Sequence, residues 1–262
     1  MRALHTAATG MMAQELNVEI ISNNIANMRT TGYKRQRAEF QDLLYESLRR
    51  VGSTTSDQGT MVPAGVQVGS GVRTASTPRV MSQGDVSQTE KDLDVAVRGE
   101  GYFRIQMPDG RTAYTRDGSF ERDAQGQLVT NDGYVVDPGI TIPENASGLA
   151  ISKTGIITGT LPGQTGTTSF GQLQLSHFVN KSGLDAIGDN LFLETAASGT
   201  PQTSTAGSDG LGDILQGYLE QANVNSVSEI SDLIAAQRAY EMNSKVISAA
   251  DEMLQSTSGM FR

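Results

Sequence analysis

Apolar residues near the N-terminal end of the chain recur with the spacing of a packed helix. Between residues 3 and 28 they follow a seven-residue repeat, with a second row three positions later, which is how one helix packs on another. We expect this helix to end near Gly32 and to pack against more than one neighbour. The first row holds Leu4, Met11, Val18 and Ile25, the second holds Ala7, Ile21 and Met28 with Gln14 as an interruption, and a third row (Ala8, Met12, Leu16 and Ile20) widens the face.

A second helical pattern lies at the other end of the chain. The spacing Ser226-x-x-Glu229 is typical of a capping box at a helix start. Pro is absent after position 201 and Gly is absent from 218 to 258, so neither residue interrupts this stretch. The sequence predicts one long helix over 226–256. Its apolar and small positions are Ile230, Leu233, Ala236, Tyr240, Asn243, Ile247, Ala250 and Leu254, with Ala239, Val246 and Met253 on the adjoining row.

The middle of the chain has a different period. Between positions 93 and 139, short runs rich in Val, Tyr, Phe and Thr alternate with turn dipeptides. This pattern predicts short antiparallel strands joined by tight turns, and residues 148–160, 170–178 and 191–195 continue it. The dipeptides are Asp109-Gly110, Asp117-Gly118, Gln125-Gly126, Asp132-Gly133 and Pro138-Gly139.

Stretches of linker composition separate the β-rich middle from the two helical ends. Residues 51–82 and 197–213 are rich in Gly, Ser and Thr and poor in aromatic residues. We therefore expect an α+β chain whose terminal helices pair as a coiled-coil-like axial domain, with a mostly antiparallel β-domain between extended linking segments. Its five parts are an N-terminal axial helix (1–33), an extended connection (34–82), the β-domain (83–196), a return linker (197–225) and a C-terminal axial helix (226–262).

Composition narrows the possible classes of function. The 262 residues include no Cys, which excludes disulfide scaffolds, iron–sulfur clusters and thiol nucleophiles. His5 and His177 are the two histidines, too few for a three-histidine metal site. A net charge of −9 argues against nucleic-acid binding, because phosphate contacts need a positive surface. Since no run of roughly 18 apolar residues and no secretory signal pattern occurs, we expect neither membrane insertion nor a cleaved signal peptide.

Candidate catalytic groups are weak. Ser176 adjoins His177 in an expected strand, where their side chains point to opposite faces. Carboxylates between Asp109 and Asp137 offer a glycosidase-like pair, but most of them flank turn glycines, where Asp bonds to the local backbone. We therefore expect no enzyme activity.

Candidate cofactor and metal motifs are equally weak. Positions 117, 119, 121 and 123 alternate as in a calcium loop, yet Gly is second rather than sixth in that loop. The fragments Gly69-Ser70-Gly71 and Gly99-Glu100-Gly101 lack the third Gly of a nucleotide-binding turn. We expect no cofactor and no metal.

Positive charge is concentrated near the N-terminal end. Residues 1–50 carry seven basic and five acidic side chains, whereas the remainder carries 13 and 24. Within this region Lys34, Arg35 and Arg37 form a cluster. Two interpretations are open: the cluster lies on a solvated loop, or it faces acidic groups of a neighbouring subunit.

Both ends and the middle of the chain resemble flagellar rod and hook proteins. The N-terminal part of the resemblance is Ser22-Asn23-Asn24-Ile25-Ala26-Asn27 followed by Thr30-Thr31-Gly32-Tyr33-Lys34. The central part is Gly101-Tyr102-Phe103 and the stretch from Ala113 to Phe120. The C-terminal part runs from Leu219 to Asn225 and from Ala236 to Lys245, and includes Arg238 and Asn243. Within the family, residues 38–72 are most similar to the distal-rod members.

The resemblance implies a structural polymer rather than an enzyme. Terminal helices would form an inner tube of coiled coils and the β-domain an outer layer. The partners would be further copies, proximal rod proteins, the hook protein, the rod cap, the P and L ring proteins and the flagellar type III export apparatus. The residues expected at subunit interfaces are Leu4, Met11, Val18, Ile21, Ile25, Met28, Ile230, Leu233, Ala236, Tyr240, Ile247 and Leu254. Two alternatives stay open: a proximal rod or short hook protein, and a secreted enzyme acting on the cell wall.

Overall fold

The computed structural model describes residues 2–52, 64–163 and 166–260. The chain divides into two units, each described by itself below. The terminal unit comprises the described residues of Met1–Ile25, Gln36–Pro78 and Asn225–Arg262, and the β-unit comprises those of Ala26–Arg35 and Arg79–Val224. The expected α+β class with two terminal helices and a central antiparallel β-domain is confirmed, while the expected five-part division stays a prediction.

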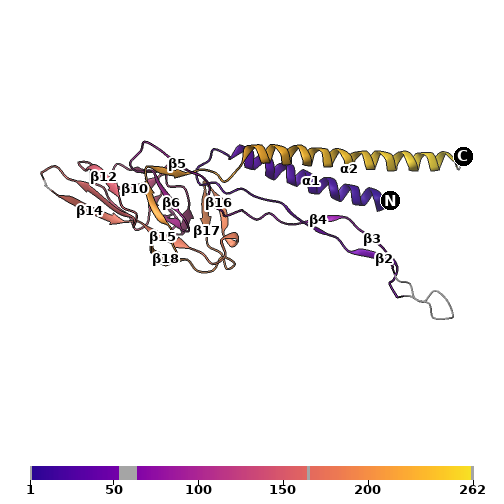
Figure 1. Cartoon of the computed structure of the whole chain (residues 1–262), viewed down its shortest axis with the longest axis horizontal. Coiled ribbons are helices and arrows are strands. Elements are labelled where there is room, and N and C mark those ends of the chain that lie inside the picture. The colour runs from indigo at the N-terminus through magenta and orange to yellow at the C-terminus, as the bar shows by residue number, and fades with distance from the viewer. Residues whose placement is uncertain (1, 53–63, 164–165, 261–262) are drawn as a thin grey trace. The chain divides into compact units, whose positions relative to one another are not determined.

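The terminal unit contains both α-helices of the described residues, α1 (Arg2–Ala26) and α2 (Ser226–Met260). They run side by side (Figure 1). Two narrow antiparallel ribbons complete the unit: β1 (Glu39–Asp42) pairs with β4 (Val72–Ser76), and β2 (Tyr45–Arg49) pairs with β3 (Val66–Gly69). The sequence predicts an extended connection over residues 34–82. In the structure its two arms pair with each other as antiparallel strands along much of its described length.

Both helices differ from expectation at one end. α1 ends at Ala26 rather than near Gly32, because a turn begins at Asn27, whose carbonyl accepts the N–H of Thr30. α2 is capped by Asn225 rather than by the expected Ser226. The Asn225 Oδ1 accepts the N–H groups of Val227 at 3.0 Å and Ser228 at 3.2 Å, because Asn is as good an N-cap as Ser and stands one residue earlier.

The β-unit is built from antiparallel sheets. The largest has the strand order β16-β17-β8-β7-β11-β10-β9, with β15 pairing to both β7 and β18. A three-stranded sheet β12-β13-β14 and the pairs β6–β19 and β5–β20 surround it. The bounds are β5 (Val86–Gln88), β6 (Val95–Arg98), β7 (Tyr102–Gln106), β8 (Thr112–Thr115), β9 (Phe120–Arg122), β10 (Leu128–Thr130), β11 (Val135–Val136), β12 (Ser147–Ile151), β13 (Ile156–Thr160), β14 (Thr167–Gln172), β15 (Gln174–His177), β16 (Asp185–Gly188), β17 (Leu191–Leu193), β18 (Gln202–Thr205), β19 (Asp213–Gln216), β20 (Tyr218–Glu220) and the 3₁₀ turn η1 (Lys181–Gly183).

Four of the five expected turn glycines adopt the left-handed backbone that such turns require. Gly110, Gly126, Gly133 and Gly139 have φ between 75° and 83°. Gly118 is the exception, because its φ is not positive and a Cβ there would lie 1.7 Å from the Val95 carbonyl oxygen. This glycine therefore permits close approach of two backbones rather than a hairpin turn.

The core belongs to the β-unit. Phe103 and Phe120, at most 1% exposed, meet edge to face at 5.1 Å within a large aliphatic cluster. A second cluster gathers Tyr102, Tyr114, Phe178, Leu184 and Phe192. Burial raises the pKa of the Tyr102 hydroxyl to about 12, so this ring stays neutral at ordinary pH. A closed core therefore forms although aromatic residues make up only 5% of the chain.

Candidate assembly surfaces

The two helices of the terminal unit contact each other at two points, which lie 14 residues apart along each helix. Near one end, Asn24 Nδ2 donates to the Glu229 Oε2 at 3.1 Å. At the other, a Cβ on Gly10 would lie 2.9 Å from the Asn243 Nδ2, so Gly10 makes room for that amide. The helices therefore run antiparallel, and the two contacts are separated by two heptads along each helix.

Asn24 is the polar anchor of this helix pair. It is 1% exposed, its Nδ2 also donates to the Gln36 carbonyl at 2.9 Å, and its Oδ1 accepts the Gln36 N–H at 2.9 Å. One amide side chain thus ties α1 to the chain that follows it and to the first turn of α2. The structure gives a physical reason for Asn at this position of the N-terminal motif.

The side of α2 that meets α1 carries a row of small, apolar and amide side chains, which we call the inner stripe. Ala236 and Ala250 are buried, and Leu233, Asn243 and Ile247 are half-buried, at successive steps of three, seven, four and three residues. Leu254 is 43% exposed although it belongs to the same stripe. The register explains this, because α1 begins at Arg2, which by the same spacing faces about position 251 of α2.

A second apolar stripe runs along the opposite side of α2 and is exposed. An α-helix rotates by about 100° per residue, so the members of this stripe lie on the side away from the inner stripe. Their exposed fractions range from 45% at Ile234 to 73% at Val227. They are Val227, Ile230, Ile234, Met242, Val246 and Met253. We call this set the outer stripe of α2. A helix that is apolar on two opposite sides is typical of one that packs between neighbours.

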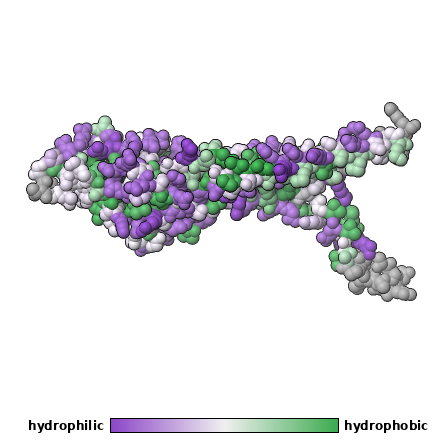
Figure 2. Space-filling model, turned by 45° about the horizontal axis from the view of Figure 1, so that its top comes forward, coloured by the Kyte–Doolittle hydropathy of each residue, from purple (hydrophilic) through white to green (hydrophobic). Residues whose placement is uncertain are grey.

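The ribbon of β2 and β3 is also uncovered. All five residues of β2 are exposed, and so are Val66 and Val68 of β3. Leu44, just before β2, is 88% exposed. Figure 2 shows hydrophobic green on this arm next to the grey residues. A two-stranded ribbon with exposed apolar side chains is marginally stable alone, so it needs a further surface to pack on.

The residues expected at subunit interfaces take several environments. Ile21 and Ala236 are buried within the chain. Leu4, Met11, Val18, Ile25, Leu233 and Ile247 are half-buried. Met28, Ile230, Tyr240 and Leu254 are 37–49% exposed. Their role in contacts between subunits stays a prediction.

A buried ionic cluster lies in the β-unit, at the segments that carry the family resemblance. The Lys34 Nζ lies 2.5 Å from the Glu220 Oε1, and the Arg116 Nε lies 3.2 Å from the Glu220 Oε2, with side chains 0–5% exposed. Burial lowers the pKa of Lys34, and the nearby Glu220 carboxylate opposes that shift. Both interpretations of Lys34 from the sequence, a solvated loop or an intersubunit contact, are wrong because its partner is in the same chain.

Backbone groups complete this ionic cluster. The Lys34 Nζ donates to the Ser82 carbonyl at 2.8 Å, and the Glu220 Oε1 accepts the Gly84 N–H at 3.0 Å. Arg116 donates to the Gly101 carbonyl at 2.7 Å and to the Gly99 carbonyl at 2.8 Å. The Gly99-Glu100-Gly101 fragment therefore holds a guanidinium rather than a nucleotide.

Asn223 performs a similar role beside the cluster. Its Oδ1 accepts the Arg35 N–H at 2.8 Å, and its Nδ2 donates to the Val80 carbonyl at 2.7 Å. The Gly32 N–H, at a φ of 69°, donates to the Glu220 carbonyl at 2.8 Å. Segments 32–35 and 220–223, almost 190 residues apart in sequence, are thus joined through polar contacts that hydrophobic periodicity does not detect.

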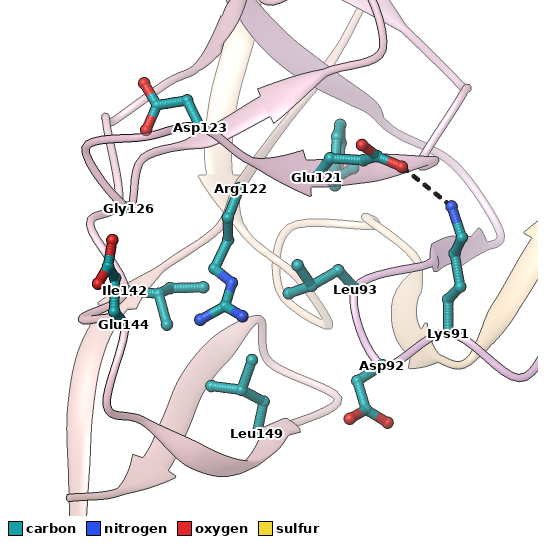
Figure 3. A pocket seen from close by; sticks show the side chains of 11 residues that line it. Lys91, Asp92, Leu93, Glu121, Arg122, Asp123, Gly126, Ile142, Glu144 and Leu149 are labelled. Atoms are coloured by element: carbon teal, nitrogen blue, oxygen red, sulfur yellow. Dashed lines mark hydrogen bonds and ion pairs between the residues drawn. The ribbon is translucent and has the colours of Figure 1, made fainter.

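A hollow in the described β-unit has a volume of about 530 Å³ and lies beside β9 (Figure 3). Arg122 points into it, and Leu93 and Leu149 contribute apolar surface. Two of its four carboxylates have structural roles, because Glu121 pairs with Lys91 at 3.0 Å and the Asp123 Oδ1 accepts the N–H groups of Gln125 and Gln127. This arrangement fits the turn interpretation of these acidic residues.

Three matches to family models cover the beginning, middle and end of the chain. Residues 4–34 match the flagella basal body rod protein model, residues 96–159 match the flagellar hook protein FlgE/F/G D1 domain, and residues 215–260 match the flagellar basal body rod FlgEFG protein C-terminal model. The chain is 59% identical over 258 residues to the flagellar basal-body rod protein FlgG of Caulobacter vibrioides, covering 98% of both chains.

The chain belongs to the FlgG family of flagellar basal-body rod proteins. It is also 46% identical to the FlgG protein of Borreliella burgdorferi, covering 97% of this chain and 96% of that one, and 35% identical to that of Bacillus subtilis, covering 97% of both. The chain is therefore a structural component of the flagellar rod. Across the described residues, neither helix is long and apolar enough to cross a membrane.

Proposed function

We propose that this chain is a structural subunit of the distal flagellar rod, where copies polymerise into a stiff helical tube. The observation that carries the proposal is the distribution of uncovered apolar side chains. Of the 19 large hydrophobic side chains that lie exposed among the described residues, 16 belong to the terminal unit. Surfaces of this kind are stable in water only when other protein covers them.

Further copies of the same chain would cover these exposed apolar side chains. A contact between two different surfaces, repeated with a rotation that does not close, generates an open helical filament. The inner stripe of α2 and the heptad rows of α1 then pair in a coiled-coil-like manner within the axial layer, while the outer stripe of α2 meets neighbouring copies. The acidic β-unit, with 12 basic and 18 acidic side chains, forms the outer layer.

The tube so formed transmits motor torque to the hook and conducts exported subunits. Its location is the rod that crosses the periplasm to the outer membrane, within the P and L rings. Its axial neighbours are the proximal rod proteins and the hook protein, and the rod cap assists assembly. Export uses the flagellar type III apparatus without a cleaved signal peptide. Membership of the FlgG family supports these proposed partners.

Electron microscopy of basal bodies from a strain lacking this chain tests the proposal. A rod stump without a hook is the expected result. A complete rod that lacks its hook alone would move the chain to the hook, and basal bodies identical to the parent strain would contradict a rod function. Re-expression of the full chain is the control, and it should restore rod and hook together.

A further inference from the structure

The β-unit exposes very few apolar side chains, which makes each of them informative. Among its described residues, the large hydrophobic side chains that lie exposed are Met28, Val179 and Ile187, and Val179 is the most exposed of these at 82%. An exposed apolar side chain that is rigidly held loses little freedom on binding, so Val179 is suited to a contact with another apolar surface.

Val179 is rigidly held. Phe178, the preceding residue, is 2% exposed and meets Tyr114 edge to face at 4.8 Å. Asn180, the following residue, donates from Nδ2 to the Ala197 carbonyl at 2.9 Å. The neighbouring Lys181 pairs with Glu100, whose side chain is 54% exposed. We call residues 178–181 the knob.

The hollow of Figure 3 has the complementary character. Leu93 and Leu149 are half-buried within it, so a small apolar side chain can contact them. Four carboxylates and two cations line it, a net charge of −2. Lys91 and Glu121 pair with each other, and Asp92, Asp123 and Glu144 outnumber Arg122 in the rest of the lining. An additional positive charge is therefore attracted to the rim.

The knob and the hollow lie toward opposite ends of β6. Residues 91–93, just before the strand, line the hollow, and Glu100, just after it, pairs with Lys181 of the knob. The four residues of β6 span about 13 Å. A knob on one end and a hollow on the other fit a contact that repeats from copy to copy without closing.

We propose that the knob of one copy docks in the hollow of a neighbouring copy, forming a head-to-tail contact between β-units. Val179 covers Leu93 and Leu149, while Lys181 exchanges Glu100 for carboxylates of the hollow. That exchange costs little, because the ion pair lies at the surface, where water screens it. The inference rests on the proposed function, since it needs the chain to polymerise.

Cysteine cross-linking tests the contact cleanly because the chain contains no Cys. The double variant Val179→Cys with Glu144→Cys replaces two exposed side chains, one on the knob and one at the hollow. In rods isolated from cells that depend on this variant, oxidation should produce dimers and higher ladders on a non-reducing gel. The matched control is Val179→Cys with Asp132→Cys, since Asp132 is exposed and lies outside the hollow.

The outcomes separate the contact from the function on which it rests. Rods that contain the double variant but show no more dimer than the control overturn the contact and leave the rod function standing. Rods that never contain the chain overturn the rod function. If the double variant builds no rods, Val179→Asp decides: it should lower motility at least about tenfold through like-charge repulsion, and Glu144→Lys should restore it. Unchanged motility of Val179→Asp overturns the contact.

Discussion

The β-unit and the terminal unit bury their apolar residues in opposite ways. The β-unit surrounds a continuous core of at least 18 buried residues. The terminal unit has no such cluster within its described residues, and it carries most of the exposed large hydrophobic side chains of the chain. Figure 2 shows this contrast on one face, where purple and white with scattered green cover the β-unit. One unit is stabilised within the chain, and we expect the other to depend on neighbouring copies.

The largest expected effect is in the terminal unit. Leu233→Asp places a charge in the half-buried inner stripe of α2, where burial without a partner is unfavourable. We expect no rods and no motility, while the free energy of unfolding of the β-unit changes by less than about 0.5 kcal/mol. Electron microscopy and urea denaturation measure the two quantities.

Gln237→Asp is the matched control for this variant, because it adds the same charge at an exposed position of the same helix. Rods and normal motility in Leu233→Asp would show that the inner stripe is not needed for assembly. A loss of assembly in both variants would point to total charge rather than to the stripe.

A smaller effect is expected from residues 46–72, which include the ribbon β2–β3 and also residues 53–63, outside the described part of the chain. The segment has exposed apolar side chains and low charge, so we expect it to lie across adjacent subunits and stiffen the tube. Replacement by a flexible Gly/Ser segment of equal length should give bent, hook-like structures. Straight rods by electron microscopy would refute this role.

The next effect concerns the contribution of the buried ionic cluster to the stability of the β-unit. Glu220→Gln leaves Lys34 and Arg116 without their buried countercharge, and breaking such a pair costs roughly 3–5 kcal/mol. Urea denaturation followed by tyrosine fluorescence measures the loss. Glu121→Gln is the control, because that carboxylate is 57% exposed and pairs with Lys91 on the surface, where about 0–1 kcal/mol is expected. Equal losses in the two variants would contradict the structural role of the cluster.

The smallest effect is a pH dependence. Burial holds the pKa of Lys34 below its ordinary value of 10.5. Between the two values the unfolded chain binds more protons than the folded chain, so this residue makes the free energy of unfolding rise with pH, by at most about 1.4 kcal/mol per unit. The slope applies below 10.5 and vanishes once the pH falls below the folded pKa.

Lys34→Met should remove this slope. The raised pKa values of Tyr102 and Tyr114 act in the opposite direction above pH 10, so the difference between parent and variant at pH 8–10 isolates Lys34. A difference in the free energy of unfolding that stays constant with pH would show that Lys34 titrates alike in both states.

Much of the fold follows from local sequence signals. The turn dipeptides located the hairpins β7–β8, β9–β10 and β10–β11, because Gly at positive φ is a local requirement. For β18 and β19 the sequence instead predicts a linker, which the structure corrects. They lie in a Gly- and Ser-rich stretch, and their pairing with β15 and β6 depends on partners far away in sequence.

The polar contacts were less predictable than the strands. Lys34 and Glu220 both stand in motifs that resemble the family, yet nothing local shows that they meet, because 186 residues separate them. The expected interface residues present the reverse case: their heptad spacing is visible in the sequence, whereas the copies that we expect them to contact lie outside a single chain. The opposite charges of Lys34 and Glu220 in the two motifs are the sequence signal that could have indicated the cluster.

The most direct test of the account measures whether the outer stripe of α2 is covered in the rod. Val246→Cys places a single thiol in that stripe, on a side chain that is 48% exposed in the chain by itself. The account predicts that maleimide labels the purified free chain rapidly and isolated rods at least about ten times more slowly, as burial between copies requires. Equal labelling rates in the free chain and in the rod would contradict it.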